Sequence, residues 1–296
     1  MRDLLRSMVW QGLAVMAAGP AVLLLMPALS AGSAGGTETM AALREPQAAQ
    51  FDAAISSDAV KDLFEVRVYR ITPGLMDAFV KWMEVATKWQ ESVGMHIVGQ
   101  FAAPQQHRYV WIRKYSDETA RKKLFAAVYG SGGMKQFGPP PGYEGGDVFL
   151  ARAAKQSKLQ FSAAAPMAMP VPEGTASGTA IYEFRIYDIK AGTLGSFAAF
   201  MGDRMVPWQE TAWKARVFGQ LLPYARVVGS SDGGKVSPEE STYIWMRVFA
   251  DEATRLEQYK MYKDENFRKV GAPAGAGFEK VRMVILANPT RFSKLQ

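Results

Sequence analysis

The sequence contains no cysteine, and this absence removes several chemistries at once. A chain without thiols forms no disulfide, carries no lipoprotein-type lipid anchor, uses no thiolate nucleophile and offers no sulfur ligand to a metal. Histidine is nearly as scarce, with 2 residues in 296. Because two histidines without a carboxylate at ligand spacing do not make a zinc or copper site, we expect no metal and no cofactor.

Sequence motifs for several common functions are missing as well. The sequence has no phosphate-binding loop, no dinucleotide fingerprint and no Gly-x-Ser-x-Gly elbow. Its formal net charge is +7, but most of the 35 basic residues are dispersed among the 28 acidic ones. Nucleic-acid binding requires basic residues gathered on one surface, so we expect no nucleic-acid partner.

The first 36 residues are predicted to be a secretory signal peptide. Arg2 and Arg6 give a basic start, an apolar run extends to about Leu29, and small residues follow, which is the typical order in such peptides. The alternative is an uncleaved anchor, because Met8 to Leu29 is long enough to cross a bilayer. Glycine and proline interrupt that run, so we expect cleavage, no stable membrane span afterwards, and a periplasmic or secreted mature protein.

A thirteen-residue stretch occurs twice, as YVWIRKYSDETAR from Tyr109 and as YIWMRVFADEATR from Tyr243, with six identical positions. Shorter motifs repeat in the same order, including Trp-Gln-Glu, Gly-Gln after an apolar residue, and Ser-Lys-Leu-Gln. Self-similarity of this kind indicates a tandem duplication. The chain is accordingly divided into a signal peptide (1–36), a flexible lead-in (37–61), repeat 1 (62–161), a linker rich in alanine and proline (162–179) and repeat 2 (180–296).

Each copy is predicted to contain the elements β, α, β, β, α, β. In the first copy these are a strand from Phe64 to Ile71, an amphipathic helix from Phe79 to Val93, a hairpin of Met95–Phe101 and Arg108–Tyr115, a helix capped by Ser116 or Asp117, and a strand from Asp147 to Arg152. This is the order of a ferredoxin-like unit. The expected fold class is therefore α+β, with two tandem ferredoxin-like units. Pro207 is expected to kink or end the first helix of the second copy.

The repeated motifs resemble the NIPSNAP family of the dimeric α+β barrel superfamily. The resemblance rests on aromatic-Glu-x-Arg-x-Tyr in the first strand and on Tyr-x-Trp-x-Arg before Asp-Glu-x-x-Arg, and it covers nearly all of 63–160 and 180–296. It implies that two ferredoxin-like sheets pair into a barrel with helices outside, and that a tandem chain forms this barrel within itself. The family has no well-established activity, so the resemblance implies a fold more strongly than a function.

Strand alternation separates charged from apolar residues. If Phe64, Val66 and Val68 lie under the helices, their neighbours point into the barrel. The candidate ligand-binding residues on that inward face are Glu65, Arg67, Tyr69, Trp111 and Arg113 in copy one, and Glu183, Arg185, Tyr187, Trp245 and Arg247 in copy two. They are interpreted either as fixed ion pairs joining the sheets, or as the wall of a cavity for a small anionic or aromatic molecule.

His96 is the candidate catalytic residue, because a histidine facing inward has a pKa suited to a general base. A lone histidine is more often structural, and superfamily analogy adds haem ligation by His96 or His107 as a less favoured alternative. The Gly/Pro segment 130–146 is expected to lack regular structure and to be either plain surface or a cover in which Phe137 and Tyr143 close a cavity.

The sequence is therefore compatible with two functions. The favoured one is a small-molecule-binding or protein-interaction module, and the alternative is a cofactor-independent oxygenase or isomerase acting on a small aromatic or quinone-like substrate in the barrel. A pocket enclosing His96 together with Arg67 or Arg113 would favour the enzyme. A solid barrel core would favour the module.

Overall fold

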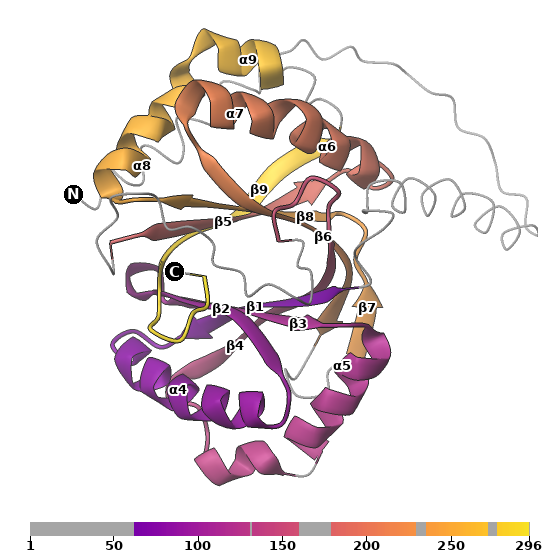
Figure 1. Ribbon diagram of the computed structural model, residues 1–296, viewed down its shortest axis with the longest axis vertical. Coiled ribbons are helices and arrows are strands. Elements are labelled where there is room, and N and C mark those ends of the chain that lie inside the picture. The colour runs from indigo at the N-terminus through magenta and orange to yellow at the C-terminus, as the bar shows by residue number, and fades with distance from the viewer. Residues whose placement is uncertain (1–61, 131, 160–178, 229–234, 272–276, 296) are drawn as a thin grey trace, which may run out of the picture.

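The computed structural model describes residues 62–130, 132–159, 179–228, 235–271 and 277–295 (Figure 1). The expected signal peptide, the lead-in and nearly all of the linker lie outside these residues. Within the described ranges, no helix is both long enough and apolar enough to span a membrane.

The two halves of the chain contain the expected elements in the expected order. The first half contains β1 (Leu63–Ile71), α4 (Met76–Ser92), β2 (His96–Ala103), β3 (Arg108–Tyr115), α5 (Glu118–Phe125) and β4 (Tyr143–Ala153). The second contains β5 (Ile181–Ile189), α6 (Leu194–Phe200), α7 (Val206–Trp213), β6 (Arg216–Val228), β7 (Lys235–Pro238), β8 (Thr242–Phe249), α8 (Glu252–Gln258), α9 (Glu265–Gly271) and β9 (Phe278–Pro289). The second half differs mainly by the additional β7 and α9.

The strands form a closed antiparallel barrel of eight strands within one chain. Their order is β4-β1-β3-β2-β9-β5-β8-β6, a β4–β6 pairing closes the ring, and β7 extends the sheet beyond β6. The helices of the first half cover one side of this barrel and those of the second half cover the opposite side (Figure 1). The intramolecular barrel that the family resemblance implied is therefore found.

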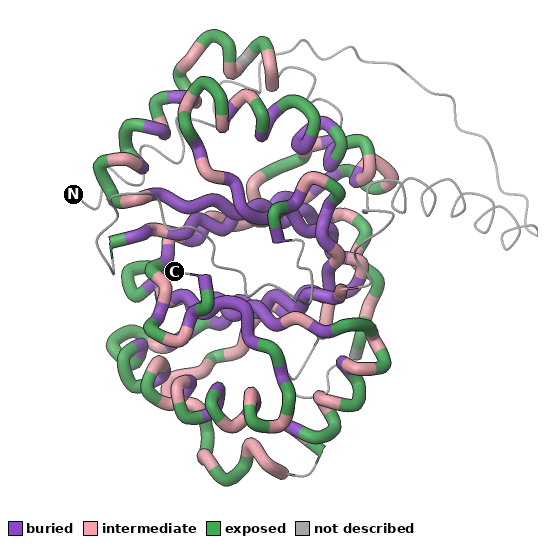
Figure 2. The backbone as a smooth tube through the Cα atoms, viewed as in Figure 1, coloured by how far each residue is buried: buried purple, intermediate pink, exposed green. Residues whose placement is uncertain are grey.

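The barrel interior is filled by apolar side chains from both halves. Phe64 and Val66 of β1 share one buried cluster with Phe184 of β5, and the Phe184 ring centroid lies 4.9 Å from that of Phe101. Figure 2 shows the buried residues concentrated along the strands. This corrects the expectation that Phe64 and Val66 lie under the helices. Alternation sorts strand residues into two faces correctly, but it does not say which layer each face meets.

The helices cover two further clusters on the outer face of the sheet. Tyr69 and Trp111 pack with Phe79 of α4 in the first half. Tyr187 and Trp245 pack with the helices of the second half. The aromatic residues expected inside the barrel thus lie between the sheet and the helices.

Two helices begin in ways that bear on the predicted caps and breaks. Asp117 caps α5, because its carboxylate accepts a hydrogen bond of 2.7 Å from the Ala120 amide. The helix containing Pro207 does not end there. A π-helical turn, Met201–Met205, precedes α7 and places Pro207 in the first turn of α7, where a missing amide hydrogen costs little.

The described part of the Gly/Pro segment, 132–146, is more ordered than expected. It contains a short 3-10 turn, Gly133–Phe137, and β4 already begins at Tyr143 rather than at Asp147. The Trp82 indole donates a 3.0 Å hydrogen bond to the Phe137 carbonyl, and the Phe137 ring lies 5.7 Å from that of Trp89. Phe137 therefore packs against α4, and the Tyr143 ring lies 5.0 Å from that of Tyr69 on the outer face of the sheet, so neither ring closes a barrel mouth.

Each half ends in a short tail that docks on the other half. The backbone amide of Gln220 donates to the Ser157 hydroxyl at 3.0 Å, and the backbone amide of Gln100 donates to the Ser293 hydroxyl at 3.3 Å. The C-terminal tail can be followed from β9 down to β2 in Figure 1. The repeated Ser-Lys-Leu motif is thus a reciprocal connection between the halves.

The leucine and lysine of each tail make matching contacts. Leu295 packs over Gly99, and Leu159 packs over Gly219. A β-carbon at Gly99 would clash with the Phe101 ring and press tightly on Leu295, and a β-carbon at Gly219 would clash with Met246 and Leu159. Lys294 pairs with a glutamate of α4 at 2.7 Å and Lys158 with one of α7 at 2.5 Å. Glycine is therefore required at both positions for close packing.

Candidate functional site: two buried glutamate–arginine clusters

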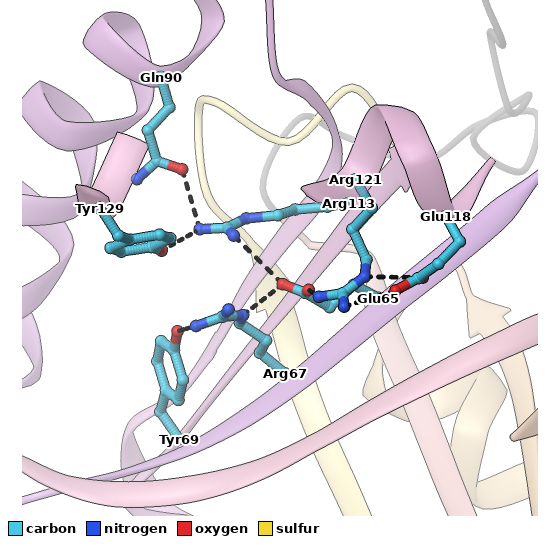
Figure 3. A network of polar contacts seen from close by, with 8 residues as sticks. All are labelled: Glu65, Arg67, Tyr69, Gln90, Arg113, Glu118, Arg121 and Tyr129. Carbon is cyan, nitrogen blue, oxygen red and sulfur yellow. Dashed lines mark hydrogen bonds and ion pairs between the residues drawn. The ribbon is translucent and has the colours of Figure 1, made fainter. Parts of the chain in front are cut away.

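Glu65 of β1 is the centre of a buried charged cluster in the first half (Figure 3). Its Oε1 accepts hydrogen bonds from Arg67 Nε at 2.5 Å and from Arg113 Nη1 at 3.2 Å. Arg121 of α5 lies 3.7 Å from Oε2 and is itself held by Glu118 through two bonds of 2.9 and 2.8 Å. The carboxylate therefore faces three guanidinium groups.

The helical layer supplies the remaining hydrogen-bond partners. Arg113 Nη2 donates to Gln90 Oε1 of α4 at 2.9 Å and to the Tyr129 hydroxyl at 2.7 Å (Figure 3). The Arg113 guanidinium also lies 3.7 Å from the centroid of the Trp111 ring, a cation–π contact. Arg67 Nη1 donates to the Tyr69 hydroxyl at 2.9 Å.

These contacts correct the expected direction of the charged residues. Glu65, Arg67 and Arg113 face the helices, not the barrel interior. An unpaired buried charge is costly, and the interior consists of apolar faces with few hydrogen-bonding groups. The helical layer contributes an amide, a phenol and a further arginine, so the charged face is stable there.

The second half contains the corresponding cluster around Glu183 of β5. Its Oε1 accepts hydrogen bonds from Arg185 Nε at 2.7 Å and from the Tyr259 hydroxyl at 2.6 Å, and its Oε2 accepts one from Arg247 Nε. Arg247 Nη2 donates to the Tyr262 hydroxyl at 3.1 Å. The structure therefore brings together the candidate residues of each copy, but as two separate clusters on opposite sides of the barrel.

The two clusters differ in how tightly they are closed. The Arg67 side chain is 1% exposed, whereas that of Arg185 is 12% exposed. Gln90 accepts from Arg113, but the corresponding Gln209 Oε1 has no hydrogen-bond partner in the described structure. The first cluster also contains buried atoms without a hydrogen bond, Glu65 Oε2 and Arg113 Nε. The second cluster therefore differs from the first mainly in being more open to solvent.

Both carboxylates remain ionised at neutral pH. Burial alone would raise the pKa of Glu183, but the guanidinium groups of Arg185 and Arg247 outweigh burial and lower this pKa to about 2. The pKa of Glu65 is lowered in the same way, against burial, by Arg67 and Arg113. Burial raises the pKa of Tyr69 and of Tyr187, so both phenols stay protonated.

His96 lies outside both clusters. It is the exposed first residue of β2, and a bulge between Ile97 and Gly99 breaks the alternation from which an inward direction was expected. Partial burial and the positive charges of Lys294 and Lys114 lower the pKa of His96.

The two histidines do not fit a haem enclosed by the barrel. His107 is also exposed, in a turn with a left-handed backbone (φ 54°), beside a shallow hollow of about 140 Å³ at the start of α4. Among the described residues, no group of three or more histidine, aspartate and glutamate side chains is placed to hold a metal ion.

Several residues of the clusters were not identified from the sequence. Gln90 and Arg121 carried a signal, because each belongs to a motif that both copies contain. No such signal marked the tyrosines of the helical layer, because their positions are not repeated between the halves. These are Tyr129, Tyr259 and Tyr262. Duplication therefore marks the shared centre of each cluster and not its surroundings.

Comparisons with known proteins support the fold. No protein-family model and no curated protein matches the sequence. An anthrone oxidase-like protein of known structure matches at 10% identity with a TM-score of 0.51, covering 80% of this chain and 94% of that one. Two further similar structures are a NIPSNAP family protein from Agrobacterium tumefaciens str. C58 (20% identity, TM-score 0.31, 41% of this chain and 95% of that one) and a mutant chlorite dismutase from Candidatus Nitrospira defluvii (11% identity, TM-score 0.44, 80% and 94%). At such identities the first similarity indicates a shared α+β barrel fold alone.

Proposed function

We propose that this protein is an exported, non-catalytic interaction module of NIPSNAP type, built from two tandem ferredoxin-like units. The repeated motifs and the matching element order support the family and the duplication. The observation that carries the functional proposal is the position of the charges. Both glutamate–arginine clusters lie under helices, where their charges are paired, and the barrel interior is apolar.

A catalytic barrel would need space and polar groups at the same place. Ligand pockets combine an apolar wall with a few convergent polar groups. Here the polar groups are on the outside of the sheet, while rings from opposite halves meet inside, with Phe101 and Tyr182 centroids 4.7 Å apart. We infer that the clusters tie the helices to the sheet and that function lies at the surface.

Binding of a small carboxylate at the second cluster is a second candidate. Arg185 is partly exposed, and its guanidinium lies 5.1 Å from the Tyr262 ring and 5.6 Å from the Trp245 ring, an arrangement suited to a planar anion. The oxygenase or isomerase alternative has less support, because His96 is separate from both clusters. The name of the anthrone oxidase-like neighbour adds nothing to it at 10% identity.

Native mass spectrometry of the exported protein tests the proposal. We expect one species whose mass equals that of the mature polypeptide, before and after denaturation. A stoichiometric small molecule that is released on denaturation would contradict it. The matched variants Arg185→Lys and Arg67→Lys then locate that molecule, since only the first position is open to solvent.

A further inference from the structure

The barrel has two seams between its halves, and they are unequal. Strands β4 and β6 pair over six positions, from Val148 opposite Val227 to Ala153 opposite Leu221. Strands β2 and β9 pair at two, Phe101 opposite Pro289 and Ala102 opposite Asn288. The difference arises because β6 has 13 residues, whereas β2 has 8 and the chain turns away at Pro104. Among the described strands, none pairs with the second edge of β9 before Asn288.

The side chain of Gln106 occupies part of this free edge. Its Nε2 donates to the Val284 carbonyl at 2.9 Å, and its Oε1 accepts from the Leu286 amide at 2.7 Å. A primary amide offers the same donor and acceptor as a peptide group. Gln106 therefore bonds to β9 as the backbone of a neighbouring strand would.

The repeat shows which strand is missing. Gly99 of the first half aligns with Gly219 of the second. With this alignment, Gln106 corresponds to Arg226 of β6. Arg226 lies opposite Phe149 of β4. Counted from the matched tail serines, Phe149 corresponds to Ile285, which lies between the two β9 residues that Gln106 contacts. Gln106 thus stands where the other seam has a continuing strand.

The side chains beside the free edge are correspondingly uncovered. On β4, Val148 and Leu150 are 2% and 1% exposed, with Val227 and Ala225 of β6 opposite them. Their counterparts on β9, Val284 and Leu286, are only half-buried. A row of backbone groups that no described strand pairs with, beside half-exposed apolar side chains, is a template for an added strand.

We propose that the edge of β9 from Phe278 to Leu286 binds an extended peptide segment of a partner protein as an additional antiparallel strand. This deepens the proposed interaction function and rests on it. The filled seam indicates the chemistry of the partner, namely small or β-branched apolar side chains against Val284 and Leu286. Arg226 pairs with Asp147 on β4, but Met283 stands in the place of Asp147, so an apolar residue is expected opposite Ile285.

A second copy of this chain fits the edge less well. Antiparallel pairing of two β9 strands about the middle of this edge would set the two Arg282 side chains opposite each other, with Lys280 of each copy nearby. Like charges directly opposite in a sheet are destabilising. The pairing of Arg282 and Lys280 with a single carboxylate, Asp188, leaves an excess of positive charge in each copy.

The probe is a fluorescent peptide, LLPYALVV, which carries the sequence of residues 221–228 with leucine in place of Arg226. Its binding to the mature protein is measured by anisotropy, and hydrogen exchange locates it. We expect protection of the β9 amides. Gln106→Ala should bind at least about fivefold more tightly, because the competing side-chain hydrogen bonds are removed, each worth about that factor. Gln105→Ala is the matched control and should bind as wild type does.

One protein variant and one modified peptide distinguish main-chain hydrogen bonding from non-specific hydrophobic binding. Val284→Pro removes an amide that points away from β5, a substitution that edge strands tolerate, and should abolish binding without lowering the melting temperature substantially. A peptide N-methylated at its edge-facing amides should also fail to bind, and this arm leaves the protein unaltered. Three results would each overturn the proposal. They are equal binding of the methylated and unmethylated peptides, protection from hydrogen exchange at amides away from β9, and dimerisation of Gln106→Ala without peptide binding. If the peptide does not bind and native mass spectrometry detects no small molecule, the β9 site is rejected, but the proposal of an interaction module is retained.

Discussion

Replacing Glu183 by glutamine should destabilise the protein in a way that depends on pH. The substitution keeps the shape of the side chain and removes the charge that Arg185 and Arg247 surround. At neutral pH it leaves two buried guanidinium groups without their carboxylate. The loss of a buried partner charge is among the most destabilising single changes in a protein.

The expected magnitude follows from the pKa of Glu183. Folding lowers this pKa from 4.5 to about 2, because both arginines stabilise the ionised form. A lowered pKa means that the ionised carboxylate stabilises the fold above pH 4.5 and that this contribution is lost as the pH falls towards 2. By linkage the contribution is about 3 kcal/mol at neutral pH and about half of that near pH 3.

Urea unfolding followed by tryptophan fluorescence measures this difference. The free energy of unfolding of Glu183→Gln should lie about 3 kcal/mol below that of wild type at neutral pH, and the two should converge as the pH is lowered. Glu257→Gln is the control, because that exposed carboxylate pairs with Lys260 at the surface and should contribute less than about 1 kcal/mol. A Glu183→Gln difference that stays constant with pH would refute the account of the cluster.

Three further predictions concern the reciprocal tails and the N-terminus. Gly99→Ala and Gly219→Ala should each lower the free energy of unfolding by about 1–3 kcal/mol in chemical denaturation, because the added carbon meets packed side chains; wild-type stability in both would contradict the close packing. Leu159→Ala and Leu295→Ala should each cost about 2–5 kcal/mol, and a difference much below this would mean that the tails do not dock. Intact-mass measurement of exported protein should place the mature N-terminus between Ser30 and Thr37, and retention of Met1 would reject cleavage.

The element order was predictable because each segment carries a local signal. The β-branched alternation of Phe64 to Ile71 and the three-and-four spacing after Phe79 have direct counterparts in β1 and α4. Asp117 was expected as one of two capping residues, and the structure shows the hydrogen bond. The repeat itself identified the residues at the centre of each cluster.

The direction of the charged face was not predictable in the same way. Whether Glu65 meets the helices or the barrel interior depends on what the opposite layer offers, and the partners Tyr129 and Tyr262 have no signal in the sequence. The prediction that His96 lies on the same face as Gln100 was wrong for a local reason. The extra residue Val98 in the β2 bulge shifts the alternation between them.

Closure of the barrel within one chain is the structural feature on which the positions of both clusters and of the β9 edge depend. Val148 and Val227 lie directly opposite each other across the β4–β6 seam, and the chain has no native cysteine to interfere. Opposite residues of antiparallel strands are within the Cα separation that a disulfide requires. After mild oxidation at low protein concentration, the double variant Val148→Cys with Val227→Cys should form a disulfide within a monomer, detected by mass after proteolysis. Disulfide-linked dimers, or two free thiols under the same conditions, would contradict an intramolecular barrel.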